Sequence, residues 1–201
     1  MGNENLDTKN KLLQAAIDIF GLKGEVTTRE ITEKAGVNVA AINYYFGNKN
    51  NLLKEVEDYY ANILNSMQHE ILNNRTLNPT EKLVKWAYNL AAFMFQFPAL
   101  IELIANLSTL DKRYNPALIE TIYLDTEVQY MIEDSIKKSI GCSDAEIIKH
   151  KYLQIFSGII GLVVHHIIAK VFFAEKGVIG IDNNKELEEY IEKFITGILV
   201  K

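Results

Sequence analysis

Apolar residues recur three or four positions apart along almost the whole chain, which is the spacing of one face of an α-helix. The stretch DTKNKLLQAAIDIF carries Leu13, Ile17 and Phe20 on one such face, and KELEEYIEKFITGILV repeats the spacing near the end. No confident strand pattern, in which apolar and polar residues alternate, interrupts this series. The pattern therefore predicts an all-α fold of about nine helices.

Capping residues mark two short helices in the first quarter of the chain. Thr27 followed by Glu30 is a capping box, which predicts a helix start, and Gly36 ends that helix. Asn38 can cap the next helix, VAAINYYF, which Gly47 ends. With the helix that precedes them, these elements predict a three-helix unit with a tight glycine turn before its third helix, as in a helix-turn-helix.

Later helix boundaries follow prolines and one serine. Because proline suits the first turn of a helix, Pro98 predicts one start and Pro116 another, and the second of these helices is expected to run to Gly141. Ser143 is expected to cap the longest helix of the chain. The later part of the sequence therefore predicts a helical bundle larger than the N-terminal unit.

The composition is that of an ordinary soluble protein. Hydrophobic residues make up 48% and charged residues 23% of the 201, which favours a packed core over disorder. Cys142 is the single cysteine, and together with the polar start MGNENLDTKNK it favours a cytoplasmic location. The net charge of −5 argues against a general nucleic-acid coat, but the early concentration of lysines allows a local basic face that meets phosphate.

The apolar segment IFSGIIGLVVHHIIAKVFF, residues 155–173, is about as long as a membrane span. His165, His166 and Lys170 interrupt it, and each of these side chains is costly in lipid. We therefore expect a helix of a soluble protein and no membrane partner. The two adjacent histidines diverge on a helix and no Cys/His cluster accompanies them, so we expect no metal and no other cofactor.

The helix VAAINYYF has two different faces. Ile42 and Phe46 lie four residues apart, so they share a face and would anchor the helix inward. Val39, Ala40 and Asn43 point elsewhere, and their side chains are small or able to form hydrogen bonds. A helix that enters the major groove of DNA needs this combination, because bulky side chains would block its approach.

Residues 8–54 resemble the DNA-binding domain of the TetR family of bacterial transcriptional regulators. The resemblance rests on LLQAAIDIFGLKG, TTREITEKAGVN and AAINYYFGNKNNLL, with alanine-glycine-valine, an aromatic pair ending in Phe, and a lysine three residues later as a specific set. It implies a helix-turn-helix DNA-binding domain over residues 1–54 and a ligand-binding and dimerisation domain over residues 55–201.

Candidate DNA-contacting residues lie on the outward face of this helix and at nearby helix ends, where phosphates would lie. They are Thr27, Thr28, Arg29, Asn38, Val39, Ala40, Asn43, Tyr44, Tyr45 and Lys49. The resemblance implies that Thr27, Tyr44 and Lys49 hold phosphates and that Arg29 approaches a base or a phosphate. Alternatively, Thr27 only caps its helix, Arg29 forms a surface ion pair, and Tyr45 packs.

Asn43 departs from the commonest pattern of the family. Many members carry tyrosine at this position, whereas a substantial subgroup carries asparagine. Because an asparagine amide can bond to N6 and N7 of adenine together, we hypothesise that Asn43 reads an adenine.

The rest of the chain gives weaker indications. Ser157, Gly158 and Gly161 let another helix approach closely, so the last two helices can pair with their copies in a homodimer or can pack within the chain. Apolar walls with a few polar groups suit a small-molecule site, but the same aromatic spacing is that of an ordinary core. Candidate ligand residues are Trp86, Asn89, Phe93, Gln96, Glu102, Asn106, Tyr123, Tyr130 and His165.

Together these patterns predict a cytoplasmic, dimeric transcriptional regulator that binds a near-palindromic operator in double-stranded DNA. We expect a repressor that a small-molecule effector releases from its operator. One alternative is a helical dimeric interaction protein without an effector. Another is a helical enzyme, which the sequence disfavours because it shows no nucleophile elbow, phosphate loop, metal cluster or convincing acid and base pair.

Overall fold

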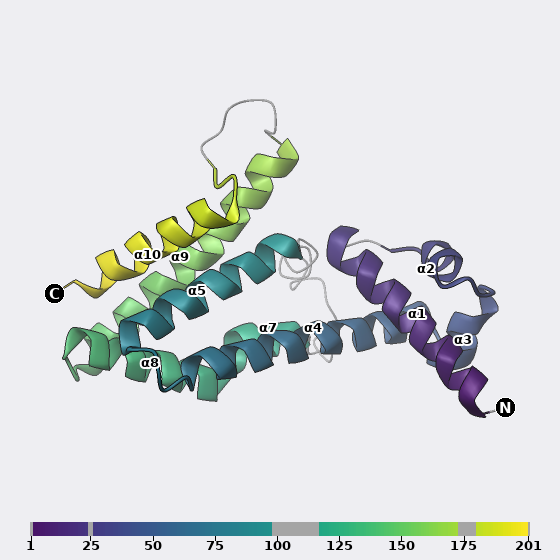
Figure 1. Ribbon diagram of the computed structural model, residues 1–201, viewed down its shortest axis with the longest axis horizontal. Coiled ribbons are helices and arrows are strands. Elements are labelled where there is room, and N and C mark those ends of the chain that lie inside the picture. Colours follow the sequence, from purple (N-terminus) through teal and green to yellow (C-terminus); the bar gives the residue numbers. More distant parts are fainter. Residues whose placement is uncertain (1, 24–25, 98–116, 173–179, 201) are drawn as a thin grey trace. The chain divides into compact units, whose positions relative to one another are not determined.

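The computed structural model describes residues 2–23, 26–97, 117–172 and 180–200, and every regular element within them is a helix (Figure 1). The all-α prediction is therefore confirmed for these residues. The predicted helix that starts at Pro98 lies outside them. The elements are α1 (Gly2–Lys23), α2 (Thr28–Ala35), α3 (Ala40–Phe46), α4 (Lys49–Leu72), α5 (Pro79–Gln96), α7 (Ala117–Ile119), the π-helical turn η1 (Glu120–Leu124), α8 (Thr126–Ile140), α9 (Ala145–Phe172) and α10 (Asn184–Leu199).

The chain forms two compact units. The first consists of Met1–Ile63 and Gln96–Tyr123, and the second of Leu64–Phe95 and Leu124–Lys201. The division falls inside the long helix α4, which contributes its first part to one unit and its second part to the other. The domain boundary predicted between residues 54 and 55 lies inside the same helix and stays a prediction.

The first unit holds its helices together through a small apolar core. Leu12 of α1, Ile31 of α2 and Ile42 of α3 are each completely buried. The hydroxyl of Tyr60 on α4 donates a hydrogen bond of 2.7 Å to the carbonyl oxygen of Ile17 on α1. Burial raises the pKa of Tyr60 to about 12, so this hydroxyl keeps its proton over a wider pH range than an exposed tyrosine would.

In the second unit, α9 packs on α8 and on α10. The Lys151 ammonium near the start of α9 donates to the carbonyl oxygens of Ile198 and Val200 at the end of α10, so these two helices run in opposite directions, side by side (Figure 1). Further along the pair, Gly158 leaves room for the ring of Phe194 on α10. The close approach of these two helices therefore depends on the absence of a side chain at residue 158.

Two predicted helix boundaries are wrong, and an aspartate is the reason at both. The expected single helix from Pro116 to Gly141 is interrupted at Asp125, whose carboxylate accepts hydrogen bonds from two backbone N–H groups at the start of α8. The longest helix is capped by Asp144 instead of Ser143, since the Asp144 carboxylate bonds the N–H groups of the first turn of α9. Both aspartates satisfy donors that would otherwise lack partners.

The apolar surface of helix α9 is larger than the part of it that other elements of the chain bury. Ala145–Ala169 has a mean hydropathy of 1.7, so length and composition alone would let it cross a membrane, although helices of soluble cores often pass the same test. Only 17% of its most apolar window is buried within the single chain. Leu153, Val164 and Ile168 are among the large apolar side chains that remain exposed. This helix therefore presents an apolar face that lacks a covering element among the described residues.

We expect Gly158→Ala to lower the free energy of unfolding by about 1–3 kcal/mol, because a Cβ at this position would lie 2.1 Å from Cζ of Phe194 and would displace the ring. Urea unfolding measures the change. The control is the same substitution in a Phe194→Leu background, where the cost should largely disappear. An equal cost in both backgrounds would show that the ring does not occupy this space.

Candidate nucleic-acid interface

Hydrogen bonds at both ends fix helix α2. The Thr27 hydroxyl accepts from the N–H of Glu30 at 3.2 Å, and the Glu30 carboxylate accepts from the N–H of Thr27 at 2.8 Å. This is the capping box that the sequence predicts. Gly36 ends the helix with φ of 68°, the left-handed conformation that glycine adopts at little cost. The turn that leads into α3 is therefore specified locally.

Helix α3 is anchored by one face. Its inward side chains are Ile42, which is completely buried, and Phe46, which is 6% exposed. The side-chain oxygen of Asn38 accepts from the N–H of Ala40 at 2.8 Å, so Asn38 caps the start of the helix as expected. Gly47 follows Phe46 with φ of 78° and stops the helix after two turns. The short helix is thus stabilised by the burial of one face, by the cap at Asn38 and by the glycine at its end.

The other face of α3 is open to solvent. Val39 is 52% and Tyr44 74% exposed, and Ala40 and Asn43 are also exposed. The side chain of Asn43 forms no hydrogen bond within the described part of the chain. Tyr45 is half-buried and meets the ring of Tyr44 edge-on, with 4.8 Å between the ring centroids. This face therefore offers an amide, a phenol and small apolar groups to a partner.

The first turns of α4 hold the neighbouring elements through side chains that the sequence did not single out for this role. Asn51 donates from Nδ2 to the carbonyl oxygen of Phe46 at 2.8 Å, at the end of α3. Lys49 donates from Nζ to the carbonyl oxygen of Val26 at 2.6 Å, just before α2. The Asn48 side chain caps α4 by accepting from the N–H of Asn51. Asn48 and Asn51, three residues apart after Gly47, are a capping pattern visible in the sequence.

Several cations in this unit already have a carboxylate partner. Arg29 bonds Glu33 at 2.7 Å one turn later on α2, with both side chains largely exposed. Lys34 bonds Asp18 of α1 at 2.9 Å, and its hydrogen bond holds the pKa of Asp18 below the usual value. Exposed ion pairs of this kind contribute little free energy, so a phosphate can compete for the cation. Arg29 therefore forms the surface ion pair that was the alternative to a DNA contact. This weak pair does not prevent the same side chain from binding a phosphate.

Lys9 reinforces the anchor of α3 from another helix. Its ammonium lies 3.0 Å from the carboxylate of Glu55 on α4 and 5.1 Å from the ring centroid of Phe46. The position combines an ion pair with a cation–π contact. Lys9 therefore links α1, α3 and α4 at the point where α3 ends.

The candidate ligand residues that the structure describes have different surroundings. Trp86 is 1% exposed and donates from Nε1 to Oε1 of Gln68 at 2.9 Å, which is the behaviour of a satisfied core residue. Phe93 is also buried, and Asn89 bonds the carbonyl oxygen of Lys85 in its own helix. Gln96 and Tyr123 belong to the first unit and are exposed, His165 in the second unit is exposed, and Glu102 and Asn106 lie outside the described residues.

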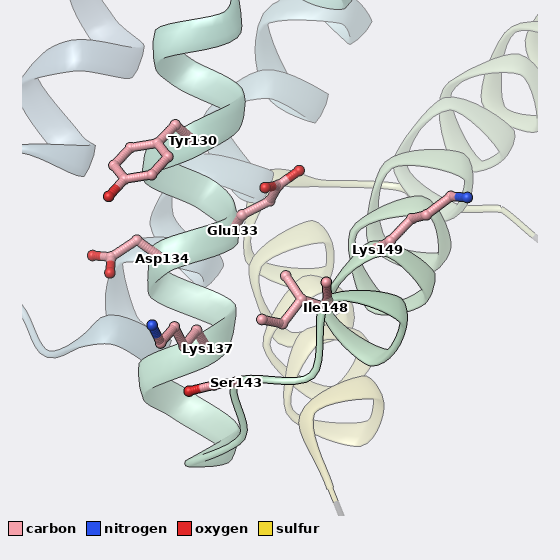
Figure 2. Close-up of a pocket in the computed structure, with 8 residues that line it drawn as sticks. Tyr130, Glu133, Asp134, Lys137, Ser143, Ile148 and Lys149 are labelled. Atoms are coloured by element: carbon pink, nitrogen blue, oxygen red, sulfur yellow. The ribbon is translucent and has the colours of Figure 1, made fainter.

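Tyr130 lines an open pocket of about 200 Å³ between α8 and the start of α9 (Figure 2). Glu133, Asp134 and Lys137 of α8 share this pocket with Ile148 and with residues around the α9 start. Asp134 bonds Lys138 at 2.6 Å, and Tyr130 is 70% exposed. The pocket is open and charged side chains form part of its lining, so its geometry does not by itself identify a ligand.

The N-terminal sequence and the fold are similar to those of known regulators. Residues 12–56 match the family model described as bacterial regulatory proteins, tetR family. A probable HTH-type transcriptional regulator, YttP from Bacillus subtilis, is 25% identical over 138 residues, which are 66% of this chain and 67% of that protein. The HTH-type transcriptional dual regulator CecR from Shigella flexneri is 44% identical over 57 residues, 28% of this chain and 26% of that protein.

A solved structure shows the same fold over nearly the whole chain. The TetR family transcriptional regulator PfmR from Thermus thermophilus matches with a TM-score of 0.56 at 17% identity, covering 94% of this chain and 96% of that one. The family model thus matches only residues 12–56, whereas the similarity in fold extends over nearly the whole chain.

We expect Thr27→Ala to lower the free energy of unfolding by about 1 kcal/mol, because the N–H of Glu30 loses its side-chain acceptor. Thr27→Ser keeps the hydroxyl and should change it by less than about 0.5 kcal/mol. Thr28→Ala is the matched control, since the neighbouring hydroxyl is not the cap. Thermal unfolding followed by circular dichroism measures all three, and equal effects at residues 27 and 28 would contradict the capping role.

Proposed function

From its membership of the TetR family of bacterial transcriptional regulators, we propose that this DNA-binding regulator is a homodimeric repressor controlled by a small molecule. The observation that supports the mode of DNA binding best is the two-sided character of α3. Ile42 and Phe46 are buried, while Val39, Asn43 and Tyr44 are exposed on a helix short enough to enter the major groove.

Each exposed group has a distinct task in this proposal. Asn43 reads an adenine, because its free amide can donate to N7 and accept from N6. Tyr44 and Thr27 contact phosphates, and Lys49 keeps two N–H donors for a phosphate beyond the one used on Val26. Thr28, Arg29, Asn38, Ala40 and Tyr45 complete the proposed contact surface. The phosphate contacts set affinity and register, and the base contacts set the sequence preference.

A second copy of the chain is the proposed cover for the apolar face of α9. Leu153, Gly161 and Val164 lie on that face, and a Cβ at Gly161 would meet nothing within 4 Å in the single chain. Pairing of α9 and α10 with their copies would bury this face in a four-helix interface. The two recognition helices would then meet successive major grooves about 34–36 Å apart on a near-palindromic operator.

The effector is proposed to bind in the domain formed by residues 55–201, at a site that includes some of the candidate polar and aromatic residues. It would favour a state of the dimer that does not fit the operator, since a ligand shifts an equilibrium only by preferring one state. Such a regulator works in the cytoplasm, where its DNA is. A helical interaction protein without an effector is the alternative, and a thermal-shift screen in which no small molecule stabilises the chain would favour it.

Asn43→Ala and Lys49→Ala should weaken DNA binding in different ways. Asn43→Ala should cost about 1–3 kcal/mol on the preferred operator and should relax specificity at one base pair. Lys49→Ala should weaken binding to all sequences alike and reduce the slope of log K against log salt by about one. Lys185→Ala removes the same charge from α10 and serves as the control. Fluorescence anisotropy at several salt concentrations measures these effects, and equal specificity of Asn43→Ala and the native chain would eliminate adenine readout.

Gly161→Leu should dissociate the dimer without unfolding the chain, because the added side chain fills open space in one copy and obstructs the approach of the other. We expect the dimer Kd to rise at least about tenfold, as overpacking typically costs 1–3 kcal/mol. Analytical ultracentrifugation measures the Kd. Gln129→Leu adds an apolar side chain to an exposed site of α8 and should leave the Kd unchanged. A native chain that is monomeric at all concentrations would refute the dimer.

A further inference from the structure

Val39 is an exposed apolar side chain at the start of the recognition helix. It is 52% exposed, whereas Ile42 and Phe46 of the same helix are buried. Its backbone already has helical geometry, with φ of −54° and ψ of −34°, and its carbonyl oxygen accepts from the N–H of Ile42. The helical backbone therefore fixes the direction of the Val39 side chain, and about half of that side chain is exposed to solvent.

At the start of α3, the methyl groups of Val39 are the groups that a partner would contact. The oxygen of the neighbouring Asn38 side chain is occupied by the N–H of Ala40. Ala40 is exposed and small, so it does not keep a partner away from Val39. One turn further, Asn43 extends the same row of the helix, with about 5–6 Å between Cβ atoms at this spacing. The row therefore presents two methyl groups and then one amide.

Among the four bases, only thymine presents a methyl group in the major groove, and apolar side chains recognise it by contact. A guanine or cytosine edge against Val39 would lose water without gaining a hydrogen bond, which disfavours those bases. We infer that Val39 reads the C5-methyl group of a thymine. Because bases rise about 3.4 Å per step, this thymine lies within about two base pairs of the adenine assigned to Asn43.

This inference rests on the proposed function and gives each half-site an A·T-containing core. The contact positions no phosphate and provides no charge, so it affects sequence preference and leaves the salt dependence unchanged. The contact would also remove the exposed apolar side chain of Val39 from water. Val39 and Asn43 together then distinguish the order of bases within the half-site.

The test begins with an operator selected from random duplex DNA by the full chain. Each thymine of one half-site is replaced in turn by deoxyuridine, which lacks only the methyl group. At one thymine the native chain should lose about fourfold in affinity, the amount expected for one buried methyl. Val39→Ala should bind the unmodified operator more weakly, but it should lose less than about twofold at that thymine on the change to deoxyuridine.

Asn43→Ala is the matched control within the same helix row. It should keep the fourfold loss on deoxyuridine but should be insensitive to 7-deazaadenine, which removes the N7 acceptor from adenine. The inference is overturned if deoxyuridine has no effect at any thymine, or if Val39→Ala remains as sensitive as the native chain. A chain that selects no DNA sequence would instead overturn the proposed function itself. Circular dichroism checks that the exposed substitution at residue 39 leaves the fold intact.

Discussion

The burial of Ile42 and Phe46 is the interaction on which the rest of the first unit depends. Helix α3 spans only Ala40–Phe46, and a helix this short is not stable in water by itself. Burying an isoleucine or a phenylalanine side chain contributes about 1.5–3 kcal/mol each, which is enough to hold this short helix in the first unit. The hydrogen bond from Asn51 and the contact with Lys9 add to the anchor at Phe46, where the helix ends.

The parts of this fold that the sequence predicted best are those governed by neighbours in the chain. The Thr27 and Glu30 capping box, the left-handed Gly36 and the inward pair of α3 all follow from spacing alone, and the structure contains each of them. Contacts between distant positions could not be read in this way. Nothing in the sequence pairs Lys49 with Val26 or Lys9 with Glu55, because these contacts exist only once the helices have packed.

The same distinction applies to the candidate ligand residues. Trp86 and Phe93 have the spacing of a pocket wall and equally that of a core, and only packing decides between them. The structure buries both, and the indole N–H of Trp86 is satisfied by Gln68. At the helix boundaries, Asp125 starts a new helix inside the segment expected to be continuous, and Asp144 takes the capping role expected of Ser143, because a carboxylate accepts from two backbone donors at once.

Because the inward anchor of α3 and its outward residues are different side chains, the proposed contacts with DNA can change independently of the stability of this domain. Exchange of Val39, Ala40 or Asn43 alters exposed atoms and leaves the buried contacts of Ile42 in place. If these residues read bases as proposed, single substitutions can redirect such a regulator to new genes without passing through poorly folded intermediates. The domain is, for the same reason, a suitable scaffold for grafting a chosen DNA specificity.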